Sequence, residues 1–433
     1  MSFNEWKINK LIDLSEKIGS GATPRGGSNV YLEEGIPFIR SQNVYNCEFQ
    51  EVGLVYIDEE SAEKLKNVNL SKGDVILNIT GDSVARCTIL PEKYIGGRVN
   101  QHVAIIRTNK KKLNPQFLKY FLVSSSMQAH MLSLAQMGAT RAALTKGMIE
   151  SFEIPTPSIK EQEEIANILS TLDDKIEVNK QICKSLENMA QAIFKQWFVD
   201  FEFPNKDGEP YKSSGGEMIE SELGMIPKGW GVEEIENISD IQNGFAFKAP
   251  EYVDEGIKVL RTLNIGNDGY FNNTDIVFLP QSYKSEKYEK YYFEEFDVAL
   301  VMVGASIGKI GMILKNTAGG LQNQNMWRFR RKEKRVSQIF IYYTVKQAQN
   351  ISKNWSTGSA RDFYRKDSFR KIKVILPEKR FMDLFEKITK PIFQNISNHA
   401  CENDELISMR DGLLPKLMSG EIRVPLDEEG DVS

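Results

Sequence analysis

Residues Glu34–Val44 read EGIPFIRSQNV, and residues Glu255–Ile265 read EGIKVLRTLNI. The two stretches have the same length, nearly the same order of apolar and polar positions, and the same Arg-x-x-Asn near the end. Self-similarity at a fixed distance in one chain indicates a repeated structural unit. This pair therefore predicts that the chain contains one unit twice.

Blocks on both sides of this pair also repeat, in the same order and at nearly constant spacing. The first block is Trp6–Gly21 and Trp230–Gly244, and the next is Gly73–Cys87 (GDVILNITGDSVARC) and Phe296–Ile310 (FDVALVMVGASIGKI). It is followed by Gly96–Arg107 (GGRVNQHVAIIR) and Gly319–Arg330 (GGLQNQNMWRFR), and then by the segments around Arg141 and Arg361. Chance does not explain five ordered matches, so a whole domain is duplicated.

Each copy has the pattern of an α+β domain. Short apolar stretches bounded by Gly or Asn, such as 74–80 and 103–107, are typical of strands. Polar and amphipathic stretches near 58–66 and 115–134 favour helices. We expect a compact mixed β-sheet domain with peripheral helices in each copy.

Each copy ends in a long helical pattern with a heptad rhythm, entered after Pro157 or Pro377. The predicted seam positions are Ile165, Ile168, Leu172, Asn179, Ile182, Leu186, Met189 and Ile193 in the first copy, and Phe385, Ile388, Ile392, His399, Leu406, Met409 and Leu413 in the second. Polar groups at such positions usually fix register. We expect an antiparallel coiled coil that joins the two domains with pseudo-twofold symmetry; the alternative is that each helix packs on its own domain.

These patterns divide the chain into six segments. Phe203–Met218, FPNKDGEPYKSSGGEM, is rich in Pro, Gly, Ser and charge and is predicted to be a linker. We expect a first domain at 1–157, a first helix at 158–201, a linker at 202–225, a second domain at 226–377, a second helix at 378–420 and an acidic tail at 421–433.

The net charge of −4 lies in that tail, where five acidic residues face one arginine, so the remaining chain is neutral. Local patches decide whether a surface attracts phosphate. Thr357–Arg380 has eight basic residues against three acidic ones. Charge therefore permits nucleic-acid binding without proving it.

Several classes of chemistry lack their motifs. The chain has no N/D-P-P-Y/F methyltransferase motif, no GxxxxGK[ST] phosphate loop, no PD…ExK nuclease core and no pair of His at metal-ligand spacing. Its four cysteines are far apart, no apolar run is long enough to span a membrane, and the start of the sequence lacks a signal-peptide core. These features predict a cytoplasmic protein without cofactor, metal or catalysis of its own.

Several segments resemble the specificity subunits of type I restriction-modification enzymes. They are AIFKQWFVDFEFP (192–204), DGEPYKSSGGEM (207–218), ELGMIPKGW (222–230), GATRAALTKGMIESFEIPTPSIKEQEEIANIL (138–169) and LLPKLMSGEIRV (413–424). The resemblance covers almost the whole chain. It implies two target recognition domains that each read half of a split DNA site, and paired helices that set the spacing. It also implies two docked methyltransferase subunits and a motor-nuclease subunit, which use S-adenosylmethionine, ATP and Mg²⁺.

Four sets of polar residues recur at matching positions and are candidates for DNA contact. Arg pairs with guanine and Asn or Gln with adenine in direct readout, and small or basic residues suit phosphate contact. The first set is Arg40, Ser41, Gln42 and Asn43 with Arg261, Thr262 and Asn264; the second is Ser83 and Arg86 with Ser306 and Lys309. The third is Asn100, Gln101 and His102 with Asn323, Gln324 and Asn325; the fourth is Thr140, Arg141 and Lys146 with Arg361, Tyr364, Arg365 and Lys366.

Each set also has an interpretation without DNA. The first and second could stabilise turns next to strands, since Asn and Gly are frequent turn residues. The third could form a hydrogen-bonded bend, and the fourth could be a solvated basic face. Two other functions remain open for the whole chain: a nuclease on an unfamiliar scaffold, and a scaffold that binds only proteins.

Overall fold

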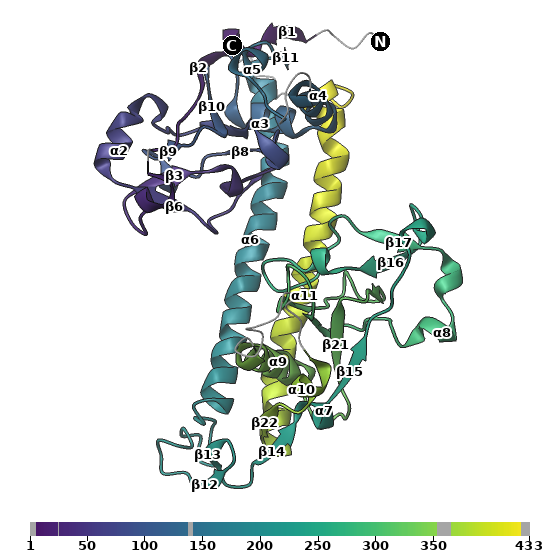
Figure 1. Ribbon diagram of the computed structural model, residues 1–433. Helices are drawn as coiled ribbons and strands as arrows, with labels where there is room; N and C mark the ends of the chain where they lie inside the picture. Colours follow the sequence, from purple (N-terminus) through teal and green to yellow (C-terminus); the bar gives the residue numbers. More distant parts are fainter. Residues whose placement is uncertain (1–5, 25, 137–141, 353–364, 426–433) are drawn as a thin grey trace, which may run out of the picture. The chain divides into compact units, whose positions relative to one another are not determined.

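The computed structural model describes residues 6–24, 26–136, 142–352 and 365–425. The chain forms two compact units: unit 1 comprises Met1–Ile176 and Leu406–Ser433, and unit 2 comprises Glu177–Glu405. Each unit consists of one globular part and a stretch of each of two long helices (Figure 1). The unit boundary therefore falls inside both helices.

The globular part of unit 1 is built on a four-stranded antiparallel sheet of order β2-β10-β7-β8. A three-stranded sheet, β6-β3-β9, contains a parallel pair, and β1 pairs with β11 at the start of the long helix. The elements are β1 Lys7–Lys10, α1 Leu11–Leu14, β2 Ser15–Ser20, β3 Ile36–Ile39, β4 Val44–Tyr45, β5 Glu48–Phe49, β6 Val55–Ile57, α2 Glu59–Lys64, β7 Val75–Asn78, β8 Cys87–Ile89, β9 Arg98–Val99, β10 Val103–Thr108, α3 Pro115–Val123, α4 Ser125–Gln136, α5 Lys146–Glu150 and β11 Glu153–Thr156.

Unit 2 repeats this topology. Its sheets have the orders β15-β21-β18-β19 and β17-β16-β20, with β16 and β20 parallel, and β14 pairs with β22. The elements are β12 Met218–Ser221, β13 Gly224–Pro227, β14 Gly231–Glu234, α7 Ile235–Ile238, β15 Ser239–Asn243, β16 Ile257–Leu260, β17 Val277–Leu279, α8 Glu286–Glu289, β18 Val298–Val301, β19 Ile310–Met312, β20 Leu321–Gln322, β21 Met326–Arg331, α9 Gln338–Ser352, α10 Lys366–Arg370 and β22 Lys373–Leu376.

Local sequence explains these elements. Every residue of β7 is buried, as an apolar run between turns requires. Helix α3 begins with Pro115 in its first turn, and the side chain of Asn114 accepts hydrogen bonds from the backbone N–H groups of Gln116 and Phe117. Proline and an Asn cap are favoured at a helix start because the first N–H groups lack partners inside the helix. The predicted strands at 74–80 and 103–107 correspond to β7 and β10, and the predicted helix near 58–66 corresponds to α2. The helical stretch near 115–134 forms two helices, α3 and α4, which are separated at Ser124.

The long helices are α6 Ile159–Phe198 and α11 Lys379–Ser419, and each begins two residues after its entry proline. In unit 2 they run antiparallel. The Asn179 Nδ2 donates to Glu402 Oε2 and to Asn403 Oδ1, both at 2.9 Å, whereas the ring of Phe198, near the end of α6, lies 4.9 Å from the ring of Phe385, near the start of α11. The predicted α+β fold with two long paired helices is confirmed.

The heptad rhythm is present, but part of the predicted seam was wrong. Five predicted seam residues are exposed: Ile168, Ile182, Met189, Ile388 and Met409. In each case the next residue along the chain is buried or half-buried instead: Leu169, Cys183, Ala190, Thr389 and Arg410. The remaining predicted positions are buried or half-buried: Ile165, Leu172, Asn179, Leu186, Ile193, Phe385, Ile392, His399, Leu406 and Leu413.

At one of these positions the error has a simple physical cause. The sequence offers two neighbouring apolar side chains, Met189 and Ala190, and the prediction chose the bulkier one. The structure buries the smaller one, and Ala190 has no exposed surface. Smaller side chains at a contact let two helix axes approach more closely. The larger Met189 is left on the outer surface.

The segment predicted to be a linker contains ordered structure. Phe203 is only 1% exposed and stacks on Tyr211 at 4.5 Å and on Trp230 at 4.8 Å. Strands β12 and β13 form a hairpin over residues 218–227, at and beyond the end of this segment. Aromatic burial thus holds this segment in the core of unit 2, although its composition indicated a flexible connection.

Among the described residues, no helix is both long enough and apolar enough to cross a membrane.

Candidate nucleic-acid interface

In unit 1, four polar segments meet at one edge of the main sheet. They are the turn between β7 and β8, the residues before β10, the residues after β2 and the residues before α5. The backbone N–H of Gly81 donates to Ala142 O at 3.1 Å, and the Thr80 hydroxyl lies 2.5 Å from His102 Nδ1. The Thr23 hydroxyl bonds to Gln101. Candidate sets two and three, which are distant in sequence, are therefore brought together.

Unit 2 gathers the corresponding segments. The Met302 N–H donates to Asn325 O at 3.1 Å, which joins the β18–β19 turn to the residues before β21. The Phe245 N–H donates to Gln322 O at 3.0 Å. The Lys366 Nζ donates to Ile241 O at 2.7 Å and brings the start of α10 next to β15.

In both units, a glycine directly after the first strand of the four-stranded sheet, β2 or β15, permits these segments to come together. A Cβ on Gly21 would lie 1.7 Å from Val99 O, and a Cβ on Gly244 would lie 1.9 Å from Asn323 O. No other residue allows so close a backbone approach. Sequence reasoning missed this role, although the two glycines end the first pair of matched blocks.

The first candidate set contains a turn that is the same in both units. The Asn43 side chain accepts from Arg40 N–H at 3.1 Å and donates to Gln50 O at 2.9 Å. Asn264 accepts from Arg261 N–H at 2.9 Å and donates to Thr274 O at 2.6 Å. Both asparagines are fully buried. Their amides are thus committed to the turn.

The other members of this set have mixed environments. The Arg40 guanidinium donates to Gly53 O at 2.5 Å and lies over the Tyr31 ring, and Arg261 donates to Asp275 O. Ser41 and Thr262 are half-buried, whereas Gln42 is exposed and donates to the same Gly53 O at 2.9 Å. Of this set in unit 1, only Gln42 presents an exposed side chain.

The second set forms tight turns between paired strands. Gly81 and Gly304 have positive φ angles of 75° and 94°, which favour glycine. Ser83, Arg86, Ser306 and Lys309 are half-buried on these turns. The Arg86 guanidinium also lies 4.5 Å above the ring of Tyr45, a cation–π contact that packs the turn against this ring.

The third set combines one buried member with exposed ones in each unit. Asn100 is 5% exposed and accepts from His102 N–H, and Asn323 is also buried. Gln101 and Gln324 are exposed, and His102 and Asn325 are half-buried. The Asn100 side chain fixes the bend in unit 1, and the glutamines of both units are exposed.

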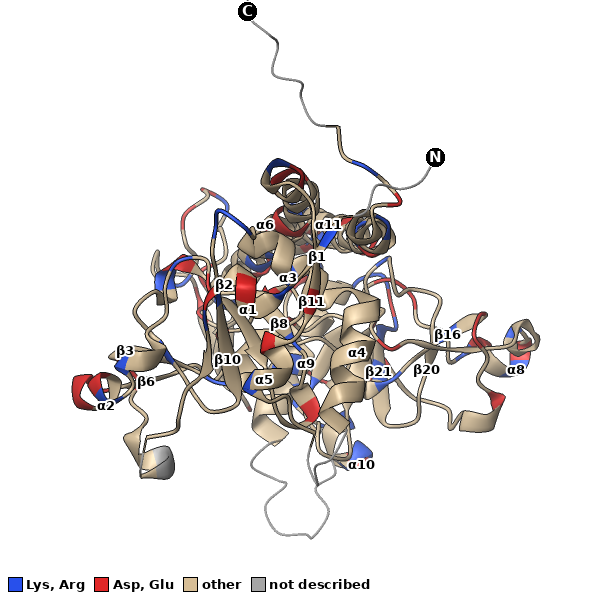
Figure 2. Cartoon of the chain, turned by 90° about the horizontal axis from the view of Figure 1, so that it is seen from above, with Lys and Arg blue, Asp and Glu red and all other residues tan. Residues whose placement is uncertain are grey.

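The fourth set is described only in part. Lys146 is exposed on α5 and pairs with Glu150 at 3.5 Å, Arg365 is exposed at the start of α10, and Lys366 is half-buried. Burial lowers the pKa of Lys366, and the charge of Arg370 adds to this effect. Thr140, Arg141, Arg361 and Tyr364 lie outside the described residues. Figure 2 shows α5 and α10 on the side of their own units away from the long helices.

Basic residues on β21 are used within unit 2. Arg328 is 4% exposed and pairs with Asp240 at 3.0 Å, while Arg330 pairs with Asp297 at 2.5 Å and with Glu294. Arg331 lies 3.3 Å from Glu386. These side chains stabilise the sheet and its contact with α11, because their positive charges are paired with carboxylates of unit 2.

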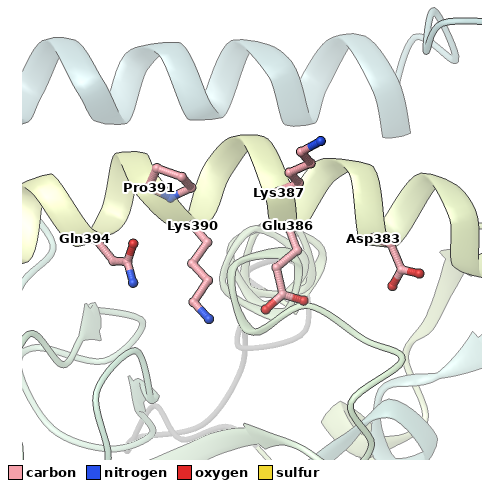
Figure 3. A pocket seen from close by; sticks show the side chains of 6 residues that line it. All are labelled: Asp383, Glu386, Lys387, Lys390, Pro391 and Gln394. Carbon is pink, nitrogen blue, oxygen red and sulfur yellow. The ribbon is translucent and has the colours of Figure 1, made fainter.

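The described residues outline a hollow along α11 whose lining differs from that of most small-molecule sites. A shallow hollow along α11 is lined by charged and polar groups, with Asp383, Glu386, Lys390 and Gln394 on one side of the helix and Lys387 and Pro391 turned the other way (Figure 3). Small-molecule sites are usually concave and mostly apolar. The ranges 6–24, 26–136, 142–352 and 365–425 contain no group of three His, Cys, Asp or Glu that could hold a metal ion.

Two globular parts with one topology, each with polar loops at a sheet edge and each carried by a helix pair, define a class of two-headed binding proteins. The type I restriction modification DNA specificity domain matches this chain at residues 4–188 and 227–398. These ranges cover most of the chain and include both globular parts. The chain belongs to the family of type I restriction-modification specificity subunits.

Individual relatives support this assignment over the full length. The HindI specificity subunit of Haemophilus influenzae is 23% identical over 479 residues, covering 97% of this chain and 100% of the relative. The MjaVIII specificity subunit of Methanocaldococcus jannaschii is 25% identical, covering 97% and 93%. The crystal structure of the S subunit from M. genitalium shares the fold with a TM-score of 0.57 at 17% identity, covering 95% and 96%.

Proposed function

We propose that this chain reads a split DNA site and catalyses no reaction itself. The globular part of unit 1 would read one half of the site, and that of unit 2 the other. The observation that carries the proposal is a constant scaffold with different loop side chains. GDSVAR at 81–86 corresponds to GASIGK at 304–309, so Asp82 in one head corresponds to Ala305 in the other. Asp can accept a hydrogen bond from cytosine, whereas Ala offers only an apolar contact.

The exposed glutamines and the exposed or half-buried basic residues of the candidate sets are the proposed contacts to DNA. Gln42, Gln101 and Gln324 would read base edges, and Arg86, Lys309, Lys146 and Arg365 would contact phosphate. The buried Asn43, Asn264, Asn100 and Asn323 would shape the loops. This division explains why the asparagines recur in two heads that are expected to read different bases.

The long helices would dock two methyltransferase subunits. Support comes from the apolar residues that the helix seam leaves outside. In unit 2, α6 exposes Val178, Ile182 and Met189, with Met189 at 60%, and α11 exposes Leu384 and Ile388. Exposed apolar groups that cluster on one surface mark interaction sites, and methionine adapts well to a partner.

The chemistry would belong to the partners. In this proposal the methyltransferase subunits use S-adenosylmethionine, and a motor-nuclease subunit uses ATP and Mg²⁺. The complex would act in the cytoplasm. A double substitution, Ile182→Glu and Met189→Glu, should abolish copurification with the methyltransferase, while the exposed control Gln191→Glu should not. Unchanged copurification of the double variant would contradict helix docking.

The experiment that tests the DNA function is base-resolved methylation mapping after co-expression with the cognate methyltransferase. The proposal predicts two short conserved sequences separated by a spacer of constant length and free sequence. Methylation without sequence preference, or at one continuous site, would contradict it.

A further inference from the structure

Helix α6 carries a largely buried carboxylate that binds three donors in unit 1. The Tyr120 hydroxyl donates to Asp173 Oδ2 at 2.6 Å, and Lys119 Nζ donates to the same oxygen at 3.0 Å. Arg410 of α11 donates to Asp173 Oδ1 at 2.9 Å. The Asp173 side chain is 14% exposed, and Tyr120 is fully buried. One carboxylate thus joins α3 of the globular part to both long helices.

A second carboxylate on α6 does the same in unit 2. Glu187 accepts from the Tyr342 hydroxyl at 2.9 Å and from Lys346 Nζ at 2.8 Å, both on α9. The Tyr270 hydroxyl, from the loop between β16 and β17, bonds to its other oxygen. The Glu187 side chain is 13% exposed. Again one carboxylate fixes a helix of the globular part to a long helix.

The two anchors share their chemistry but not their sequence position. Each combines a carboxylate, a buried tyrosine hydroxyl and a lysine placed over a tyrosine ring, at 3.7 Å for Lys119 over Tyr120 and 4.1 Å for Lys346 over Tyr342. Apolar packing would hold a helix at least as tightly, because burying charges costs desolvation energy. A buried ionic group instead favours one geometry over its neighbours, since a shifted partner leaves a charge unpaired.

The anchored helices contact the strands that carry the proposed reading turns. Helix α3 packs against β7 and β8, which flank the turn 81–86. Helix α9 packs against β18 and β21, and β18 leads into the turn 304–309. In each unit a short path of packed elements therefore runs from the carboxylate on α6 to the DNA-facing edge.

We propose that Asp173 and Glu187 are positioning residues, which fix the orientation of each reading head on the helices and thereby the spacer length that the protein accepts. The inference rests on the proposed function. An anchor would not change which bases a head prefers. It would restrict the angle at which the head meets the helix pair, so that its loss broadens the range of accepted spacers.

The test measures methylation by the full complex on DNA in which the two half-sites, mapped for the unmodified protein, are separated by the native spacer or by spacers one base pair shorter or longer. Asp173→Asn and Glu187→Gln remove the anchor charges. Asp174→Asn and Glu177→Gln are matched controls, because both residues are exposed carboxylates on the same helix. Tyr120→Phe and Tyr342→Phe remove one donor each and keep the ring.

Each anchor variant should retain both half-site sequences while its preference for the native spacer falls by roughly tenfold, and the controls should behave like the unmodified protein. The tyrosine variants should shift in the same direction by less. If the carboxylate variants fail to assemble, the tyrosine variants decide the question.

Anchor variants that melt at lower temperature but keep the original spacer preference would overturn the inference, because their role would then be structural only. An unmodified complex that methylates no split site would overturn the proposed function as well, so the two failures are distinguishable.

Discussion

Substitution of Asn264 by Ala tests whether this residue stabilises its turn or reads DNA bases. The change removes the acceptor for Arg261 N–H and the donor to Thr274 O, at 2.9 and 2.6 Å, from a residue with no exposed surface. Losing these bonds and leaving a buried polar group unpaired should cost about 1–3 kcal/mol. In a unit of this size, thermal unfolding should therefore begin roughly 2–12 °C lower.

The assay pairs thermal unfolding, followed by tryptophan fluorescence, with methylation mapping below the melting temperature of both proteins. We expect Asn264→Ala to melt earlier and to keep the same bases in both half-sites. Leu263→Ala is the matched control, because Leu263 is the adjacent residue and is 53% exposed. An unchanged melting temperature together with a changed base preference would refute the scaffold role and make Asn264 a reader.

Phe203→Ala should destabilise unit 2 by about 3–5 kcal/mol, because Phe203 is buried between aromatic rings. The control Lys206→Ala should have little effect. Equally small effects of both changes on thermal unfolding would show that the segment is a flexible linker. Arg365→Ala should weaken DNA binding to all sequences and reduce the salt slope by about 0.9, and an unaltered slope in binding titrations would argue against phosphate contact. Although burial raises the pKa of Asp173, the charge of Lys119 and the hydrogen bonds from Tyr120 and Arg410 outweigh it and hold this pKa below its usual value. The ionised Asp173 thus contributes to stability above the ordinary Asp pKa of about 4, and this contribution is lost as the pH falls through its lower pKa in the folded protein. Asp173→Asn should therefore reduce the acid sensitivity of unfolding, which is measured by fluorescence.

The duplicated fold could be predicted because the repeated blocks correspond to the strands that build each sheet. Gly73–Cys87 and Phe296–Ile310 contain β7 with the start of β8 and β18 with the start of β19, and their apolar runs are the buried strands. The two entry prolines also marked the start of both long helices. Strands and helix starts that depend on neighbouring residues in the sequence could therefore be predicted correctly.

Features that depend on three-dimensional packing could not be predicted in this way. The choice between Met189 and Ala190 depends on how closely two helices approach, and the burial of Phe203 depends on Trp230 meeting it in space. The roles of Asn43 and Asn264 required the hydrogen-bond partners Gln50 and Thr274, which are several residues away. Side-chain type identified the candidate loops, whereas burial separated turn residues from exposed ones.

The central claim, that each globular part reads its own half of a split site, is tested most directly by exchanging residues 1–157 for the matching segment of another specificity subunit and mapping methylation. The account predicts that one half-site changes to that of the donor while the other half-site is retained. A change in both half-sites, or in neither, would contradict it.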